Sequence, residues 1–303
     1  MQLPFVKYSK IWFTVSGLLM VGAIGALSLW GLKLGIDFTG GSLVELQFTP
    51  NRPSTEEVQA SMKEIGLVDN VVQKSGDQAV IIRTRFLDEP DHQKLVSKFT
   101  GTYQKGETKV LETRFETIGA TVSSQLRNRA FWGLFFVVVA VVLYVAYAFR
   151  GISRPVSSWK YGALAIVALI HDILVVVGVF SVLGRFAGVE VDIDFVLALL
   201  AVLGFSVTDR IVVYDRIREN VLRKTGQDFA ETVNVALNET LMRSINSTFA
   251  VLLPLFALYF LGGETIKNFA LALLVGMASG AYSSIFVASP LLVFVEKWQR
   301  RND

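Results

Sequence analysis

The stretch "FVLALLAVLGFSVTDRIVVYDRIREN", residues 195–220, begins like a membrane span and then places two ionisable residues inside it. No charged residue occurs from Phe195 to Thr208, and Asp209 and Arg210 then precede further apolar residues. About 20 apolar residues cross a bilayer as a helix. The segment therefore predicts a membrane span that carries charge, and intramembrane charge indicates a functional site.

The rest of the chain is also apolar. It has 303 residues, of which 52% are hydrophobic and 18% charged, whereas about a quarter are charged in an average soluble domain. Long apolar runs predict six transmembrane helices: Ile11–Leu32, Ala130–Phe149, Tyr161–Leu183, Phe195–Tyr214, Ile245–Leu261 and Phe269–Val295. The first run is longer than the roughly 7–15 apolar residues of a signal peptide, so we expect a retained anchor.

Basic residues predict the orientation. Thirteen lie on the side of the two termini, including Arg150 and Arg154, whereas the short opposite loops hold only Arg185 and Lys267. The positive-inside bias places both termini in the cytoplasm. A basic rim favours anionic lipid as a partner and needs no nucleic acid to explain it.

The residue types exclude several kinds of site. Cysteine is absent and only His92 and His171 occur, so thiolate and histidine-rich metal sites are not expected. The sequence also lacks a phosphate-binding loop, a dinucleotide fingerprint and hydrolase motifs. We therefore expect no cofactor, no metal and no enzymatic activity.

One soluble domain is expected between the first two spans, at residues 33–129. Leu43–Phe48 alternates like a strand, and Ser54 with Glu57 has the spacing of a helix-capping box. Strands at 70–75 and 79–84, a helix from about Glu89 to Phe99 and a last strand within 108–119 complete the order βαββαβ. That order predicts an α+β ferredoxin-like domain outside the cytoplasm, with residues 1–32 before it and residues 130–303 after it.

Two features of the last four spans predict helix contacts. The cytoplasmic loop 215–243 has apolar residues on one helical face, which predicts an interfacial helix between spans four and five. Small residues recur every four positions in the sixth span, which allows another helix to approach closely. Packing within the chain is favoured over a contact between subunits for this ridge of Ala272, Gly276, Gly280 and Ser284.

Asp209 lies roughly 21 Å into the bilayer if its helix begins at Phe195. A carboxyl at that depth should face a cavity, pair with a cation or take up a proton. Consecutive helix residues point about 100° apart, so Arg210 should extend toward the cytoplasm along Tyr214, and Arg243 on the fifth span is the expected partner of Asp209. The alternative is a fixed Asp–Arg pair that only locks helices together.

Two further polar groups interrupt apolar sequence. His171 and Asp172 lie within the third span, where Asp172 is a candidate second proton relay or a packing residue. In "GIDFTGGSL", Asp37, Gly40 and Gly41 predict a turn or hinge after the first span, because glycine adopts positive φ readily.

Three separated stretches resemble the SecD/SecF family of protein-export membrane subunits, within the RND superfamily. They are "GIDFTGGSLVEL", "GFSVTDRIVVYDRIREN" and "NFALALLVGMASGAYSSIFVASPLL". The resemblance implies a location in the bacterial cytoplasmic membrane and proton-driven assistance of protein export. The partners that it implies are SecD, the SecYEG translocon and unfolded exported polypeptide. It also implies that Asp209 handles the proton, that Arg243 is the basic residue of the fifth span, and that Asp37, Gly40 and Gly41 form the motif after the first. Arg210 departs from the family, which has a small polar residue there.

Three hypotheses follow. In the first, Asp209 exchanges a proton and its changed attraction to Arg243 moves the outer domain. In the second, the chain is half of a proton-coupled small-molecule transporter. In the third, it is a non-conducting scaffold whose polar residues serve packing alone.

Overall fold

The computed structural model describes residues 3–104, 106, 108–148, 156 and 158–302. The chain divides into two compact units, which we call the membrane unit (Met1–Lys33 with Phe131–Asp303) and the sheet unit (Leu34–Ala130). Arg150 and Arg154, two of the basic residues used to predict the orientation, lie outside the described residues.

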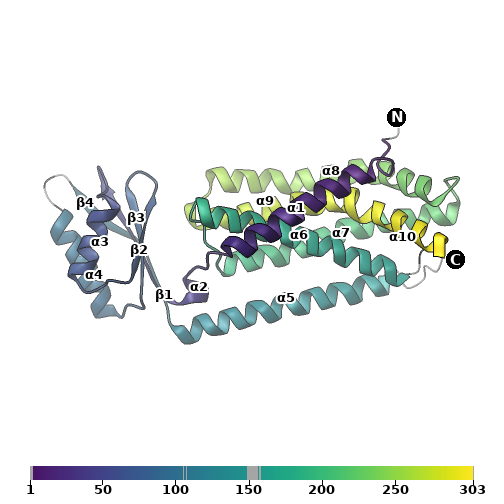
Figure 1. Cartoon of the computed structure of the whole chain (residues 1–303). Helices are drawn as coiled ribbons and strands as arrows, with labels where there is room; N and C mark the ends of the chain where they lie inside the picture. The colour runs from purple at the N-terminus through teal and green to yellow at the C-terminus, as the bar shows by residue number, and fades with distance from the viewer. Residues whose placement is uncertain (1–2, 105, 107, 149–155, 157, 303) are drawn as a thin grey trace. The chain divides into compact units, whose positions relative to one another are not determined.

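The membrane unit consists of long helices that run side by side (Figure 1). Within the described residues, six stretches are long and apolar enough to cross a membrane, as the sequence predicts. The helices are α1 (Ser9–Trp30), α5 (Ala120–Ala148, which begins in the sheet unit), α6 (Ser158–Phe186), α7 (Ile193–Arg223), α8 (Phe229–Leu261), and a sixth stretch made of α9 (Glu264–Ser283), the π-helical turn η1 (Ser284–Ala288) and α10 (Ser289–Asn302).

The six stretches are not equally enclosed. At least half of the apolar window is buried in α6, α7 and the α9–α10 stretch, against at most 17% in α1, α5 and α8. The first three therefore form the centre of the membrane unit, while α1, α5 and α8 leave much of their apolar surface uncovered. Uncovered apolar surface is expected of helices that face lipid or a second membrane subunit.

The expected interfacial helix between spans four and five is a point at which the structure differs from the prediction. α7 continues to Arg223, and α8 begins at Phe229 and runs on to Leu261 without a break. Asp228 caps α8 by accepting a hydrogen bond from the Glu231 amide at 2.7 Å. The apolar face of the loop, including Phe229 and Val233, is buried in the core of the membrane unit, because a helix can bury it there as well as at a lipid surface.

The sheet unit contains the short helix α2 (Ile36–Thr39) and the elements β1 (Gly41–Thr49), α3 (Thr55–Glu64), β2 (Asn70–Ser75), β3 (Ala79–Thr84), α4 (Glu89–Tyr103) and β4 (Lys109–Ile118). The strands form one antiparallel sheet in the order β2-β3-β1-β4. Alternate residues of the strands, such as Leu46 and Ile82, pack with Met62 of α3 and Phe99 of α4. The predicted capping box is confirmed, since Ser54 accepts from the Glu57 amide and the Glu57 side chain accepts from the Ser54 amide.

The backbone of the glycine pair after α2, Gly40 and Gly41, is closely approached by neighbouring backbone segments. Asp37 lies in the first turn of α2, which ends at Gly40 with φ of +74°. Gly41 has φ of +115°, and a Cβ there would lie 2.6 Å from the Thr84 carbonyl oxygen on β3. The second glycine is therefore required both by its dihedral angle and by the neighbouring strand.

We expect Gly41→Ala to destabilise the sheet unit by about 1–3 kcal/mol from the strained backbone, with an added cost from the clash with Thr84. Gly66→Ala is the matched control, because Gly66 has φ of +82° but nothing within 4 Å of its added Cβ. Hydrogen exchange of the β1 and β3 amides in the full chain measures the difference. Equal loss of protection in the two variants would show that the contact with Thr84 is unimportant.

Candidate functional site

A buried ion pair lies at the centre of the membrane unit. Asp172 of α6 is fully buried, and Arg210 of α7 is 1% exposed. One terminal nitrogen of the guanidinium donates to Asp172 Oδ2 and to the Ser283 hydroxyl, the latter at 2.8 Å. Asp172 also accepts hydrogen bonds from the hydroxyls of Ser206, at 2.6 Å, and Ser279, at 3.2 Å. The pair and its three serines join α6, α7 and α9.

Small residues on α9 allow this cluster to form. A Cβ added to Gly276 would lie 2.3 Å from a methyl carbon of Val202, and one added to Gly280 would lie 2.8 Å from the Ser206 hydroxyl. Two other members of the predicted ridge, Ala272 and Ser284, are fully buried. The ridge therefore faces α7 of the same chain, and the two backbones approach closely beside the ion pair.

Asp209 occupies a different environment, although it precedes Arg210 in the sequence. Its side chain lies against α8, where Oδ1 accepts a hydrogen bond from the Ser244 hydroxyl at 2.8 Å. Its other oxygen, Oδ2, is buried and makes no hydrogen bond within the described part of the chain. The Ser284 hydroxyl and the charges of Arg210 and Arg243 also lie close enough to influence Asp209, but no ion pair joins Asp209 to a cation among the described residues.

The expected position of Arg210 is corrected by the structure. It does not extend toward the cytoplasm along Tyr214; it turns inward to Asp172. The Asp172 carboxylate compensates the charge of the buried guanidinium, although Nε and Nη1 of Arg210 make no hydrogen bond within the described part of the chain. The prediction missed a signal for this arrangement that the sequence carries: Ser206 and Arg210 are four residues apart, as are Ser279 and Ser283, so each pair lies on one helix face.

Arg243 lies away from the buried pair. Its side chain is exposed and lines a polar cavity of about 480 Å³ with Thr240 and with charged residues of α7 and α8. On one wall of this cavity the Arg216 guanidinium donates to Glu239 at 2.8 Å. Arg243 directly precedes Ser244, the hydrogen-bond donor to Asp209. The cavity and the contact with Asp209 therefore involve consecutive residues of α8.

His171 is the other candidate polar residue of the third span. Its Nδ1 lies 3.2 Å from Asp172 Oδ1, and its ring is 6.2 Å from that of Tyr282. Its Nε2 is buried without a hydrogen-bond partner in the parts of the chain described here. No group of three or more metal-ligating side chains is found within the described ranges.

The arrangement separates two buried carboxyls chemically. Asp172 is neutralised by Arg210 and accepts several hydrogen bonds, so it can remain charged. Asp209 makes one hydrogen bond, from Ser244, and its Oδ2 makes none within the described residues, so protonation would relieve the cost of burying its charge. Among the candidates from the sequence, Asp209 contacts Ser244, which follows Arg243 in α8. Asp172 lies in the separate cluster with Arg210. The residues of the motif after the first span, Asp37, Gly40 and Gly41, lie in the sheet unit.

The comparisons with known proteins agree on one family. Residues 98–298 match the family "Protein export membrane protein SecD/SecF, C-terminal", and residues 31–51 match the "SecD/SecF GG Motif". A protein translocase subunit SecF of Thermobaculum terrenum is 41% identical, over 99% of this chain and 95% of its own length. One of Anaerolinea thermophila is 37% identical, over 96% and 94%.

A solved structure is also similar. The crystal structure of SecDF, described as a translocon-associated membrane protein from Thermus thermophilus, matches 98% of this chain with a TM-score of 0.84 and 31% identity. This chain spans 39% of that SecDF chain. The similarity is therefore to one part of a longer polypeptide.

We expect Arg210→Met alone to lower the free energy of unfolding by about 3–5 kcal/mol, because it leaves the Asp172 charge buried and unpaired. The double variant Asp172→Leu with Arg210→Met should recover most of that loss, since apolar residues of similar volume often replace a buried pair without cost. Denaturant unfolding of the full chain in detergent micelles measures both. A double variant as unstable as the single one would contradict the pairing.

Proposed function

The chain belongs to the SecD/SecF family of protein-export membrane proteins, and we propose that it is a SecF-type auxiliary subunit that uses the proton gradient to assist polypeptide export. The observation that carries the proton-coupling part is Asp209, a carboxyl buried in a membrane helix with one oxygen that lacks a partner among the described residues. A carboxyl in that position changes its interactions strongly when it gains or loses a proton.

In this proposal Asp209 loads the proton, and Arg243 supplies the positive charge whose attraction to Asp209 changes on loading. Ser244, which donates to Asp209, directly follows Arg243 in α8. The proposed proton path is the polar cavity that Arg243 lines, which Asp209 itself does not line. For Asp172 we propose the packing role rather than the relay role, because its charge is paired with Arg210.

The energy available per proton sets a limit on this coupling. One charge that crosses the membrane potential contributes about 2.3 kcal/mol per 100 mV. A conformational equilibrium that changes from 1:99 to 99:1 requires about 5.5 kcal/mol. Strong coupling therefore requires more than one proton per step, or a pH gradient in addition to the potential.

We further propose that both termini are cytoplasmic and that the sheet unit lies outside the cytoplasm as a ferredoxin-like domain. The bias of basic residues supports the orientation. The element order βαββαβ and the antiparallel strand order β2-β3-β1-β4 support the fold type, because the helix α3 connects two strands that are separated by β3. The domain boundaries are those expected from the sequence, at residues 1–32, 33–129 and 130–303.

SecD is the proposed partner of the membrane unit. The similarity to part of a longer SecDF chain supports this association. α7 exposes small residues, Ala201, Gly204 and Thr208, along one face, and α8 exposes Phe249 and other large apolar side chains. Close packing of helices in a membrane requires small residues, because no hydrophobic driving force acts between them there. We therefore propose that these exposed faces of α7 and α8 contact SecD.

The remaining partners are proposed from the chemistry of each surface. The edge strands β2 and β4 leave backbone donors and acceptors along the sheet, and an extended polypeptide can add to such an edge. That supports unfolded exported polypeptide as the ligand of the sheet unit and the SecYEG translocon as its source. The basic residues near both termini support binding of anionic lipid at the cytoplasmic surface.

The scaffold and coupling hypotheses assign different roles to one group, the carboxyl of Asp209. The Asp172–Arg210 cluster is what a scaffold needs, because its opposite charges pair and serine hydroxyls join the three helices, although Nε and Nη1 of Arg210 have no partner among the described residues. Asp209 has no such ion pair within the described part of the chain, and its oxygen without a hydrogen bond there adds nothing to packing and favours coupling. No observation favours a small-molecule antiporter over either.

We expect Asp209→Asn to abolish the gradient-dependent part of export while leaving assembly with SecD intact, because asparagine keeps the size and removes the proton exchange. The measurement is release of an exported protein from spheroplasts or inverted membrane vesicles, with and without a proton gradient. Asp194→Asn is the matched control, since Asp194 lies in the first turn of the same helix and does not line the cavity beside Arg243. The control should release protein normally.

The two possible failures have different meanings. Unchanged gradient-dependent release in Asp209→Asn, with assembly intact, would refute coupling through Asp209 and leave the scaffold hypothesis. Equal loss in Asp209→Asn and Asp194→Asn would show a general effect of charge on α7 and would also contradict the proposal.

A further inference from the structure

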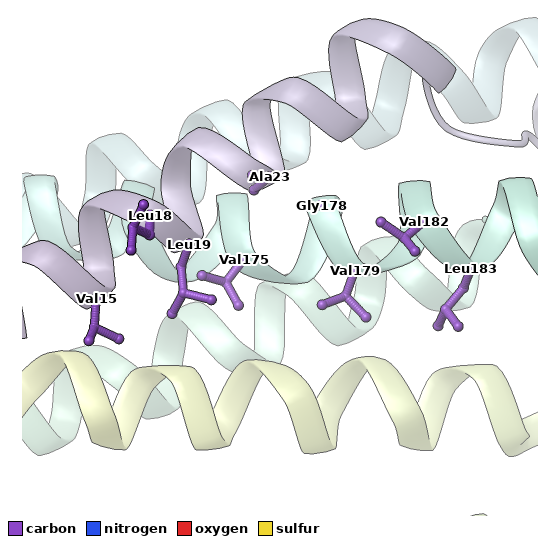
Figure 2. A pocket seen from close by; sticks show the side chains of 10 residues that line it. Val15, Leu18, Leu19, Ala23, Val175, Gly178, Val179, Val182 and Leu183 are labelled. Atoms are coloured by element: carbon purple, nitrogen blue, oxygen red, sulfur yellow. The ribbon is translucent and has the colours of Figure 1, made fainter.

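An apolar groove of about 560 Å³ lies between α1 and α6 in the membrane unit (Figure 2). Val15 and Leu19 line it from α1, and Val175, Val179 and Leu183 line it from α6. All the residues that line the groove are apolar. An extended peptide backbone would lack hydrogen-bond partners there, whereas a hydrocarbon chain requires none.

The groove exists because the two helices touch at one crossing and diverge beside it. A Cβ added to Gly178 of α6 would lie 2.4 Å from the Cβ of Ala23, so the backbones are in close contact there. Gly22, which directly precedes Ala23 on α1, lines the groove and has nothing within 4 Å of an added Cβ. The missing side chain at Gly22 therefore leaves part of the groove open.

A polar cavity adjoins the end of the groove. Leu183 lines the groove, and the next two residues, Gly184 and Arg185, line a second cavity of about 400 Å³ together with Trp30 and Lys33. Lys33 pairs with Glu190 at 3.3 Å. Arg185 is exposed, and no hydrogen bond or ion pair of its side chain is found in the described part of the chain.

Aromatic residues mark this end of the helices as the level of the lipid headgroups. Trp30 is the last residue of α1 and Phe186 the last of α6, and their rings pack edge to face with centroids 5.3 Å apart. Tryptophan is enriched at membrane–water interfaces. A free guanidinium at that level is a good donor to a phosphate.

From these observations we propose that the α1–α6 groove binds one glycerophospholipid, with an acyl chain along the groove and the phosphate at Arg185. The apolar lining fits the hydrocarbon, and the Arg185 guanidinium, which has no partner among the described residues, fits the phosphate. Arg185 lies two residues after Leu183 of the groove in the same helix. This site is at the end of α6 that carries Arg185 and is separate from the basic residues near the termini. It rests on the membrane-spanning fold alone and does not depend on a role in export.

The test uses the full chain in nanodiscs made of phosphatidylethanolamine and phosphatidylglycerol, released into the gas phase for native mass spectrometry. We expect one phospholipid to remain bound to the wild-type chain. Gly22→Leu should reduce that retained fraction at least several-fold, because leucine fills the open part of the groove without a clash. Gly25→Leu is the matched control: Gly25 also lies on α1 with nothing within 4 Å of an added Cβ, but it does not line the groove.

A second pair of variants tests the phosphate contact. Arg185→Gln should reduce retention of both phospholipids to a similar extent, while Lys267→Gln, which removes the other basic residue of the short loops on that side, should not. Absence of retained lipid in the wild type would overturn the proposal, as would equal losses in Gly22→Leu and Gly25→Leu. Retention that disappears when SecD is bound would also overturn it, because a partner helix would then occupy the groove.

Discussion

The membrane unit depends on the neutralisation of one buried guanidinium. Arg210 is almost completely removed from solvent, and a full charge in a low-dielectric interior is tolerated only when an opposite charge and hydrogen-bond acceptors surround it. Asp172 supplies the opposite charge and Ser283 an acceptor, from two other helices, and both contact the same terminal nitrogen of the guanidinium. The close approach of α7 to α9 at Gly276 and Gly280 brings these groups within reach, so the helix packing and the ion pair require each other.

This constraint also determines the surroundings of Asp209. Consecutive residues on a helix point about 100° apart, so an Arg210 that faces α6 and α9 directs Asp209 toward α8. The charge of Arg210 is already compensated by Asp172, and Asp209 is left with one hydroxyl, that of Ser244. Two carboxyls in the same membrane unit thus acquire opposite properties from their neighbours: one is held charged, and the other is available for protonation.

Much of the fold was predictable from local patterns. Uncharged runs located all six spans, and the capping box at Ser54 located the start of α3. The partner of Arg210 was not found, because a contact between residues 38 positions apart depends on which faces of two helices meet. The surface helix expected at residues 215–243 failed for a related reason, since an amphipathic pattern shows that a face is buried but not whether lipid or protein buries it.

The uncovered surfaces of the membrane unit differ in a way that follows from the physics of packing in lipid. Rigid helices associate in a bilayer through close contact of small residues, which the exposed face of α7 offers at Ala201 and Gly204. The α1–α6 groove is instead walled by valine and leucine around an open space. A rigid helix would bridge that space without filling it, whereas a flexible acyl chain can follow its contour. The shape of each surface therefore favours a protein partner at α7 and a lipid between α1 and α6.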